Sequence, residues 1–431
     1  MSKMLTFLLF TSVLLVSCSD QKSNNSNSDE VKIKKAVKKN IKKKENEKHS
    51  YNTTKIDKNL VELPEIPFGS FYKISKQGKI EKEEKVSRQT LLQPGEKLLF
   101  KASKAIKDEN LILLKNMKRL SFLDLSGTKI TGEGFSYFRK LTVEKLYLTG
   151  TEITGKPFEH LKYLSSLKEL NLSYSGVANR DIKYLSNIPN LEALNLSGTE
   201  IADEGIKHLQ HTPTLRILNA SSTKITNVGL KNLQNLSLEE LYLEGTKITD
   251  DGLKYLQNFS NIRILTVSNI TSKGLKHLQN FSTLQELDLG SNEIESGIEP
   301  LRNLSALRNL NIGNNKITDQ DLKHLQHLSA LHTLLLHETQ ITDEGLKYLR
   351  NLSSLKVLIL WDTQVDKGFE HLQYLPSLLT LGLSRTQFTD EGLKYLHNFS
   401  TLREVDLDET RVTSSGVAEL KKALPKLTIH K

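Results

Sequence analysis

One unit of 22 to 24 residues recurs along most of the chain, and this period constrains the fold more than any other feature. The unit is clearest in LHTLLLHETQITDEGLKYLRN, residues 331–351. A repeat of this length predicts a solenoid, because one copy cannot bury its apolar face without stacked neighbours. Indexed by the second apolar residue of an L-x-L pattern, the copies fall at Leu125, Leu148, Leu172, Leu196, Ala220, Leu243, Val267, Leu289, Ile312, Leu336, Leu360, Leu383, Leu407 and Ile429.

Each part of the unit predicts one piece of structure. The L-x-L alternation predicts a short strand with leucines inward. Thr342 and the acids after it predict a capped helix start, and Leu346 and Leu349 form an apolar stripe that closes the core. We therefore expect an α/β solenoid with a parallel β-sheet on the concave side and helices on the convex side.

A column of small hydrogen-bonding residues lies three positions after the index residue. Stacked copies of this column are expected to pair the backbone groups of a buried turn. The column contains Thr128, Thr151, Ser175, Thr199, Thr223, Thr246, Asn292, Asn315, Thr339, Thr363, Thr386 and Thr410.

The T-x-I-T-D-x-G-L-x-x-L form of the unit, at residues 339–349, resembles leucine-rich repeats, above all the ribonuclease-inhibitor and F-box-associated types. The resemblance covers residues 97–431, about fourteen repeats including degenerate caps, and implies a horseshoe-shaped solenoid. It also implies protein binding through the concave face. Residues 61–96 are expected to form a linker and an N-terminal cap.

The array contains one irregular stretch. The Val267 copy reads VSNITSKGL, is two residues shorter in its turn, and has Ile270 in the Thr/Asn column. The next copy is also short. A change of curvature or twist is expected near residues 267–300.

The N-terminus has the pattern of a secretory signal. Lys3 precedes a thirteen-residue apolar run at 4–16, which would rise only about 20 Å as a helix, too little for a bilayer core of about 30 Å. The segment Leu15-Val16-Ser17-Cys18 resembles the lipobox of bacterial lipoproteins. That resemblance implies a signal peptide at 1–17, a lipid on Cys18, and an exported protein held at a membrane, with the outer membrane or cell surface favoured. An ordinary signal peptide with a chance cysteine is the alternative.

The basic charge is concentrated in the segment that follows. Residues 1–60 contain 13 lysines and 6 acids, a net +7, whereas the remaining 47 basic and 44 acidic residues give +3. Residues 18–60 are therefore expected to be a disordered tether. Its Lys-rich part, 32–44, would either add an amphipathic membrane contact or act as a solvated spacer. Nucleic acid is not expected as a partner of an exported protein.

Outward-facing residues of the predicted sheet suggest two surfaces. In the first half, Asn171, Asn195 and Asn219 form a polar ladder flanked by Tyr147 and Tyr242. This group, the Asn–Tyr surface, is either part of a binding site or a plain solvated face.

The second surface is apolar. Leu335, His337, Val357, Ile359 and Trp361 are all predicted to point outward on two adjacent strands, and Trp361 is the only tryptophan of the chain. We call this group the Trp361 patch. Apolar and aromatic residues of this kind predict a partner-binding site, with burial by self-association as the alternative.

No set of residues predicts chemistry. His160, His208 and His324 share a repeat position with tyrosines, which indicates packing on the convex helices. With one cysteine, no nucleophile–histidine signature and no phosphate loop, we expect neither an enzyme nor a metal or cofactor. The prediction is a membrane-anchored protein-binding module; a structural component bridging membrane and wall, or a substrate-recruiting subunit of a separate enzyme, are the alternatives.

Overall fold

The computed structural model describes residues 60–64, 68–75, 89–93, 95–372 and 375–431. Residues 58–431 form one unit, and residues 1–57 form a second. The predicted signal peptide, the predicted lipidation site Cys18 and the predicted tether, apart from Leu60, lie outside the described residues. No helix among the described residues is long and apolar enough to cross a membrane.

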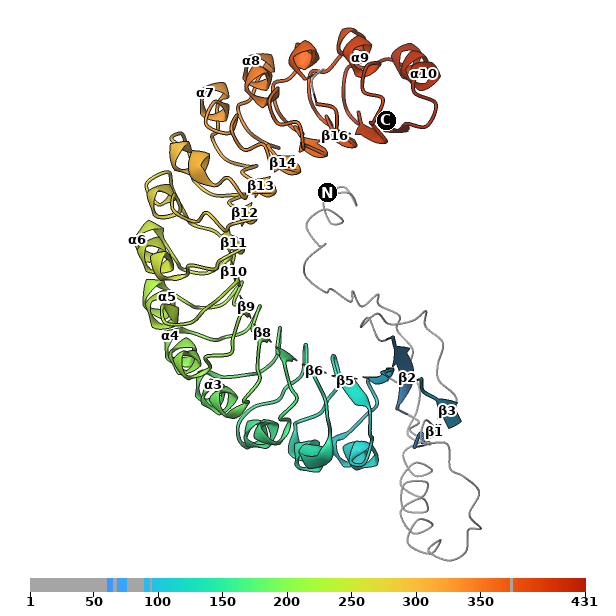
Figure 1. Ribbon diagram of the computed structural model, residues 1–431, viewed down its shortest axis with the longest axis vertical. Helices are drawn as coiled ribbons and strands as arrows, with labels where there is room; N and C mark the ends of the chain where they lie inside the picture. The colour runs from blue at the N-terminus through green and yellow to red at the C-terminus, as the bar shows by residue number, and fades with distance from the viewer. Residues whose placement is uncertain (1–59, 65–67, 76–88, 94, 373–374) are drawn as a thin grey trace, which may run out of the picture. The chain divides into compact units, whose positions relative to one another are not determined.

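A sheet of sixteen strands runs through the described part of the chain, and β5 to β18 are the strands of the fourteen indexed copies (Figure 1). Neighbouring strands from β4 to β18 pair in parallel, and equivalent residues of successive copies lie opposite one another, as Leu334 does Leu358, each two residues before its index residue. The predicted parallel sheet is confirmed. The strands are β4 (Lys97–Ala102), β5 (Leu120–Asp124), β6 (Lys145–Tyr147), β7 (Glu169–Asn171), β8 (Ala193–Asn195), β9 (Ile217–Asn219), β10 (Glu240–Leu243), β11 (Ile264–Val267), β12 (Glu286–Asp288), β13 (Asn309–Asn311), β14 (Thr333–Leu335), β15 (Val357–Ile359), β16 (Thr380–Gly382), β17 (Glu404–Asp406) and β18 (Thr428–His430).

The sheet begins with a strand of opposite direction. β2 (Gly69–Ile74) pairs antiparallel with β4, and Phe71 packs on Phe100 with ring centroids 4.9 Å apart. β1 (Leu60–Glu62) and β3 (Gln89–Leu91) form a separate antiparallel pair. The antiparallel strand covers the end of the sheet that the first repeat would leave open.

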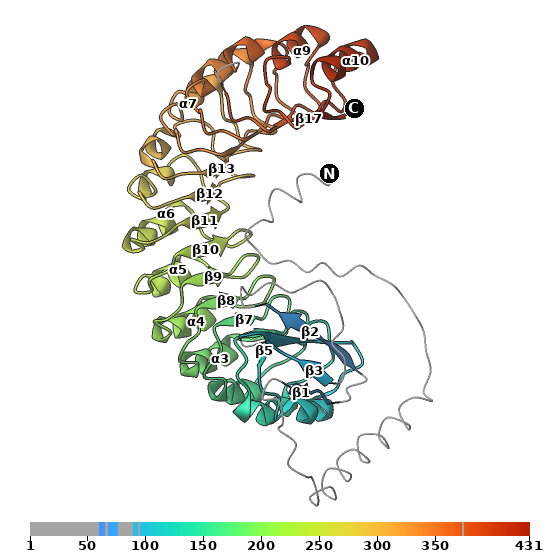
Figure 2. The ribbon, with the colours of Figure 1, turned by 45° about the vertical axis from the view of Figure 1, so that its right-hand side comes forward.

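Short helices lie on the convex side, opposite the sheet (Figure 2). Most copies have one turn of α-helix, one of 3-10 helix, or both, because 22 to 24 residues leave little chain between strands. The α-helices are α3 (Asn179–Ile182), α4 (Asp203–Ile206), α5 (Asn227–Leu233), α6 (Asp250–Leu253), α7 (Asp319–Leu322), α8 (Asp343–Leu346), α9 (Asp390–Leu396) and α10 (Ser414–Ala423). The 3-10 helices are η1 (Asp108–Leu114), η2 (Glu133–Lys140), η3 (Lys156–Tyr163), η4 (Lys183–Asn187), η5 (Lys207–His211), η6 (Lys254–Asn258), η7 (Leu275–His277), η8 (Glu299–Asn303), η9 (Lys347–Leu349) and η10 (Gly368–His371).

The turn after each strand has the same backbone conformation. The residue two positions after the index has φ between +51° and +66° in every copy from Leu125 to Leu407, at glycines and at larger residues such as Tyr174 alike. One position further, the Thr/Ser hydroxyl donates to the carbonyl of its own index residue at 2.6 or 2.7 Å. The expected pairing of the buried turn is confirmed.

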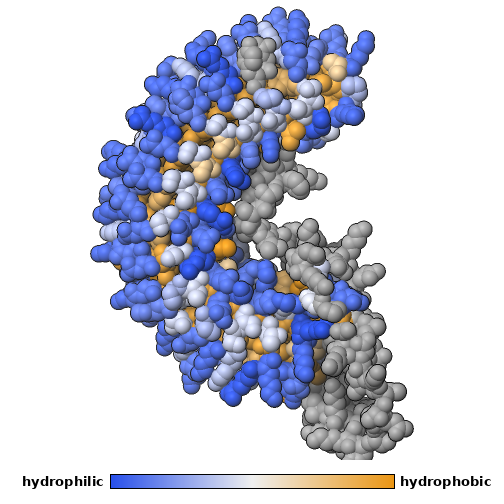
Figure 3. Space-filling view, in the orientation of Figure 1, coloured by the Kyte–Doolittle hydropathy of each residue, from blue (hydrophilic) through white to orange (hydrophobic). Residues whose placement is uncertain are grey.

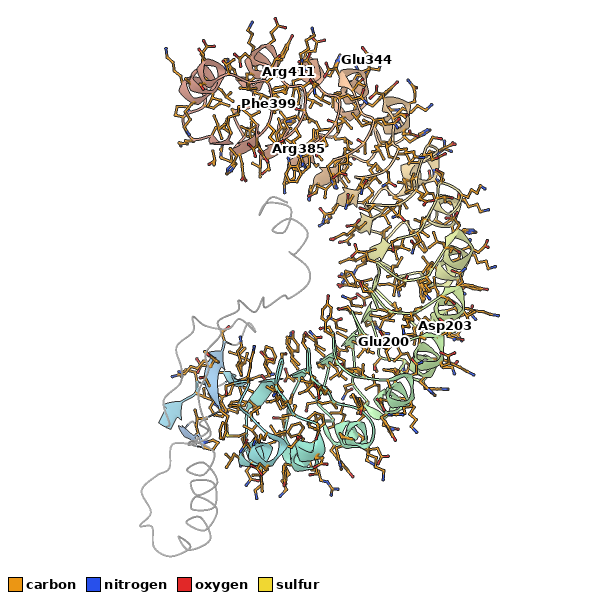
Figure 4. The ribbon with its side chains drawn as sticks, turned by 180° about the vertical axis from the view of Figure 1, so that it is seen from behind. Glu200, Asp203, Glu344, Arg385, Phe399 and Arg411 are labelled. Carbon is orange, nitrogen blue, oxygen red and sulfur yellow. The ribbon has the colours of Figure 1, made fainter. Side chains whose placement is uncertain are left out.

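Acids at the helix starts connect successive repeats. Asp203, on the outer side of the arc in Figure 4, accepts from the backbone N–H of Thr226 at 2.9 Å and from its hydroxyl at 2.6 Å. Asp319 and Thr342 repeat this pair at 2.8 and 2.7 Å. The acids were predicted to cap their own helices, and the structure shows that they also bond the next helix start.

Two asparagines compensate for the short copies. Ile270 has no hydroxyl, and Asn292 of the next copy donates to the Val267 carbonyl at 2.9 Å and accepts from the Ile270 N–H at 2.7 Å. Asn315 accepts in the same way from the N–H of Ile294 at 3.1 Å. The turn bonds therefore continue through the irregular stretch. The change of curvature or twist expected there stays a prediction.

Candidate functional site

The concave face is formed by the strand residues that alternate with the core leucines. Leu358 and Leu360 are fully buried in the core, so Val357, Ile359 and Trp361 lie on the opposite, concave face. Hydrophilic side chains cover the convex rim of the arc (Figure 3). The concave face is the surface on which both predicted groups of residues lie.

The asparagines of the Asn–Tyr surface are bonded to their own strand ends. The side-chain oxygens of Asn171, Asn195 and Asn219 accept from the backbone N–H two residues later, at 2.9, 2.9 and 3.0 Å. In the same way, Asp124 accepts from the backbone N–H of Ser126, and Asp406 accepts from that of Asp408. The ladder therefore terminates strands, a structural role that the sequence analysis missed.

The two tyrosines were expected to be exposed, and this expectation is wrong. Tyr147 is only 6% exposed: its ring packs edge-on against Phe122 with centroids 4.6 Å apart, and its hydroxyl donates to Glu169. Burial and the Glu169 carboxylate raise the pKa of Tyr147. Tyr242 is also buried, and its hydroxyl donates to Glu240 at 2.9 Å. The partner of Tyr147 lies on the neighbouring strand β7, whereas that of Tyr242 lies on its own strand β10.

The Trp361 patch is brought together as predicted, on adjacent strands, but it does not stand out into solvent. Trp361 is 6% exposed and Leu335 5%, Ile359 is fully buried, and Val357 and His337 are half-buried. The physical reason is a glycine on the next strand: a Cβ built at Gly382 would lie 2.3 Å from Trp361 Nε1 and 2.9 Å from Ile359 Cδ1. The Nε1 edge of the indole therefore occupies the space that a side chain at position 382 would fill.

Two ring nitrogens of this patch are buried without a partner. Neither Trp361 Nε1 nor His337 Nδ1 has a hydrogen-bond partner among the described residues. Burial lowers the pKa of His337, against the opposing effect of Glu338, Asp288 and Asp362. Such groups are rare in folded proteins, so each needs an explanation.

The sequence analysis also missed two kinds of residue. Gly382, and Gly313 beneath the ring of His337, make room for the rings; a glycine in the concave column next to an aromatic residue was the available signal. It also missed four carboxylates at the middle of the concave face: Glu240 on β10, Glu244 directly after it, and Glu286 and Asp288 on β12. Burial is the first cause of a raised pKa for three of them, Glu244, Glu286 and Asp288.

No group of three or more His, Cys, Asp or Glu side chains suited to a metal ion occurs in the part of the chain that the structure describes. The histidine column lies on the convex helices, with His160 on η3 and His208 on η5. The His160 ring is 6.3 Å from that of Tyr163.

Comparison with known sequences and structures supports the repeat assignment. A leucine-rich-repeat profile matches residues 187–209, 234–256 and 374–396, and a profile of two such repeats matches residues 282–328. No curated protein matches the chain. Together with the sheet and helices, these matches show that the chain contains leucine-rich repeats and has the solenoid fold of that superfamily, whose proteins are generally protein-binding modules.

Solved structures are similar to this chain at low sequence identity, and two of them, with TM-scores above 0.5, share its fold. A leucine-rich-repeat protein of Leptospira interrogans has a TM-score of 0.53 at 21% identity, covering 75% of this chain and 92% of that one. A TDR receptor has a TM-score of 0.51 at 17% identity, covering 74% and 60%. An internalin from Listeria monocytogenes has a TM-score of 0.49 at 24% identity, covering 75% and 82%.

Proposed function

We propose that this chain is a membrane-anchored lipoprotein that binds a protein ligand through the Trp361 patch. The observation that carries the binding proposal is the Trp361 indole, which lies on the concave face with a buried N–H that has no partner among the described residues. An unpaired buried donor costs about 1–3 kcal/mol, and a ligand carbonyl would recover that cost. Aromatic residues beside buried aliphatic ones are typical of binding hot spots.

The fold comparison adds limited support. One structural neighbour is a TDR receptor, but at 17% identity the likeness extends only to the fold. The proposal therefore depends on the chemistry of the patch, since a solenoid of this kind serves many functions.

The binding proposal is tested by a crosslinking pull-down from envelope extracts and external protein sources, using the full chain. Because Ile359 is fully buried, a charge there would disturb the core, so the informative variants are Trp361→Ala and Val357→Asp. Tyr174→Ala and Val228→Asp are matched controls, because these side chains are 67% and 59% exposed and lie off the patch.

We expect one partner to be captured by the wild type and both controls and lost by both patch variants. Circular dichroism of each variant checks that the repeats remain folded. Identical captures by all five proteins would contradict the binding proposal.

The anchor is proposed separately, on Cys18 and the preceding Leu15-Val16-Ser17 segment. Metabolic labelling with an alkyne fatty acid should tag the wild type and leave Cys18→Ser unlabelled, with the variant released from the membrane fraction. A Cys18→Ser protein that stays in the membrane fraction would contradict the lipid anchor.

A further inference from the structure

Four carboxylates at the middle of the concave face flank one uncharged strand. Glu240 and Glu244 extend from β10 and its end, and Glu286 and Asp288 from β12. β11 lies between them, with Thr266 in register with Tyr242 on one side and Asp288 on the other. At about 4.8 Å per strand, the two acidic strands are about 10 Å apart. We call these four residues, with Thr266, the carboxylate seat.

Little positive charge neutralises the seat. Glu244, Glu286 and Asp288 form no ion pair with any described residue, whereas Glu240 lies 3.7 Å from an Arg263 nitrogen that is closer to Glu239, at 3.1 Å. Desolvation on the concave face, and then the neighbouring Asp288, raise the pKa of both Glu244 and Glu286. The folded chain thus holds several acidic groups close together on the concave face.

Neutral donors hold part of the seat in place. Asn311 Nδ2 and the Gly290 N–H donate to one oxygen of Asp288 at 2.9 and 2.8 Å, and Asn309 Nδ2 donates to Glu286 at 3.2 Å. These bonds orient the carboxylates and leave their charge uncompensated. Fixed geometry combined with unbalanced charge is the arrangement expected of a site for a cation.

An independent observation at the centre of the seat also indicates a ligand. The Thr266 side chain is 7% exposed, and its hydroxyl has no hydrogen-bond partner among the residues that the structure describes. It lies on the concave face between Tyr242 and Asp288. A hydroxyl on the strand between the two acidic strands, with Asp288 as its register neighbour, offers one acceptor and one donor to a ligand bound there.

The geometry favours an organic cation over a metal ion. Ligands lie about 2.0–2.6 Å from a metal ion, so two ligands on opposite sides of it are about 4–5 Å apart, whereas β10 and β12 are about 10 Å apart. An ammonium or guanidinium group has several donors on an extended side chain and suits carboxylates placed on two sides. The Trp361 patch begins at β14, only two strands from β12, and offers an apolar contact that a polypeptide ligand can use at the same time.

We propose that the carboxylate seat binds a lysine or arginine side chain of the protein ligand, with the Thr266 hydroxyl accepting a hydrogen bond from one of its N–H groups. This inference rests on the proposed function, because it names the chemistry of the ligand on the same face. The ligand is then a basic polypeptide segment that lies across β10 to β12.

The test measures binding of a fluorescent ten-residue peptide of alternating Lys and Ala to the full chain by anisotropy. Glu244→Gln combined with Asp288→Asn keeps the hydrogen-bonding shape and removes two charges, and we expect Kd to rise about tenfold. The matched control, Glu204→Gln with Glu391→Gln, removes two charges from convex helices, and its Kd should change less than twofold. An equal rise of Kd in both double variants, or no rise in Glu244→Gln with Asp288→Asn, would overturn the proposal.

Three further arms separate a seat from general charge attraction. Thr266→Val should weaken the peptide about threefold, and unchanged binding would overturn the assignment of the seat. A peptide with acetylated lysines should not bind; if it binds like the unmodified one, the cation has no role. If spermine displaces the Lys/Ala peptide at a concentration equal to that of the peptide, the seat is a polyamine site and the polypeptide assignment is overturned.

The two proposals can fail separately. Trp361→Ala should leave binding of the Lys/Ala peptide unchanged, because that peptide has no large apolar side chain. A partner lost by Trp361→Ala but retained by the Glu244/Asp288 pair would support the proposed function and reject the seat.

Discussion

The Asn–Tyr surface and the Trp361 patch lie on one sheet, built by the same repeat, yet they treat polar atoms in opposite ways. In the first, the asparagine oxygens and the tyrosine hydroxyls bond to groups of the chain itself. In the second, two buried ring nitrogens have no partner among the described residues. Equal position on a solenoid therefore does not mean equal availability to a ligand.

The contrast indicates where the chain sacrifices stability. A satisfied polar group contributes to folding, whereas an unpaired buried one costs free energy that selection retains only for a reason. The Trp361 patch and the carboxylate seat both carry such a cost, and the Asn–Tyr surface does not. We therefore regard the Asn–Tyr surface as strand-terminating structure and the other two as binding surface.

The largest effect is expected where a new side chain displaces the indole. Gly382→Val places a branched group where Trp361 and Ile359 lie, and should cost about 2 kcal/mol of stability, as overpacking does. Trp361 is the only tryptophan, so its emission should shift to the red as the ring moves into water. Thr380→Val, on the same strand and face, is the control and should change neither the stability nor the tryptophan emission. An unshifted emission in Gly382→Val would contradict the packing described here.

A smaller pair of changes of opposite sign compares satisfied and unsatisfied hydroxyls. Thr223 donates to the Ala220 carbonyl at 2.6 Å, so Thr223→Val should lose about 1 kcal/mol. Thr266→Val removes a hydroxyl without a partner and should gain up to about 1 kcal/mol. Urea midpoints of both variants measure the difference, and a loss in Thr266→Val would mean that its hydroxyl is satisfied.

The smallest effect concerns pH. Burial and the neighbouring Asp288 and Glu240 raise the pKa of Glu286 above its ordinary 4.5, against the Asn309 hydrogen bond. The folded state then holds the proton more tightly than the unfolded state, so stability falls as pH rises from the ordinary value through the raised one. Glu286→Gln should melt about 1 °C above the wild type at pH 7, with the gap closing near pH 4. Glu239→Gln, which loses its pair with Arg263, should show no such gain.

Much of the fold could be predicted from the repeat alone. The index positions, the parallel strands, the convex helices and the Thr/Asn turn column follow from a pattern that recurs too often to have another interpretation, and the structure confirms them. The pattern also predicted which residues share the concave face, because alternation along a strand is a local property.

What surrounds those residues could not be predicted, because it depends on the neighbouring strands. Trp361 was expected to be exposed, and it is buried against the sheet because Gly382, more than twenty residues later, has no side chain. The acids of the helix starts were read within their own copy, while Asp203 bonds Thr226 of the next one.

The sequence by itself determined the period, the direction of each strand residue and the core, because these depend on spacing within one copy. The tertiary structure decided which polar atoms find partners and which do not. That outcome depends on the residues that stacking brings alongside, about 4.8 Å away in space and 22 to 24 residues away along the chain. Only the stacked structure shows that the indole N–H of Trp361 and the hydroxyl of Thr266 have no partner among the described residues. Both proposals of ligand binding depend on these two groups.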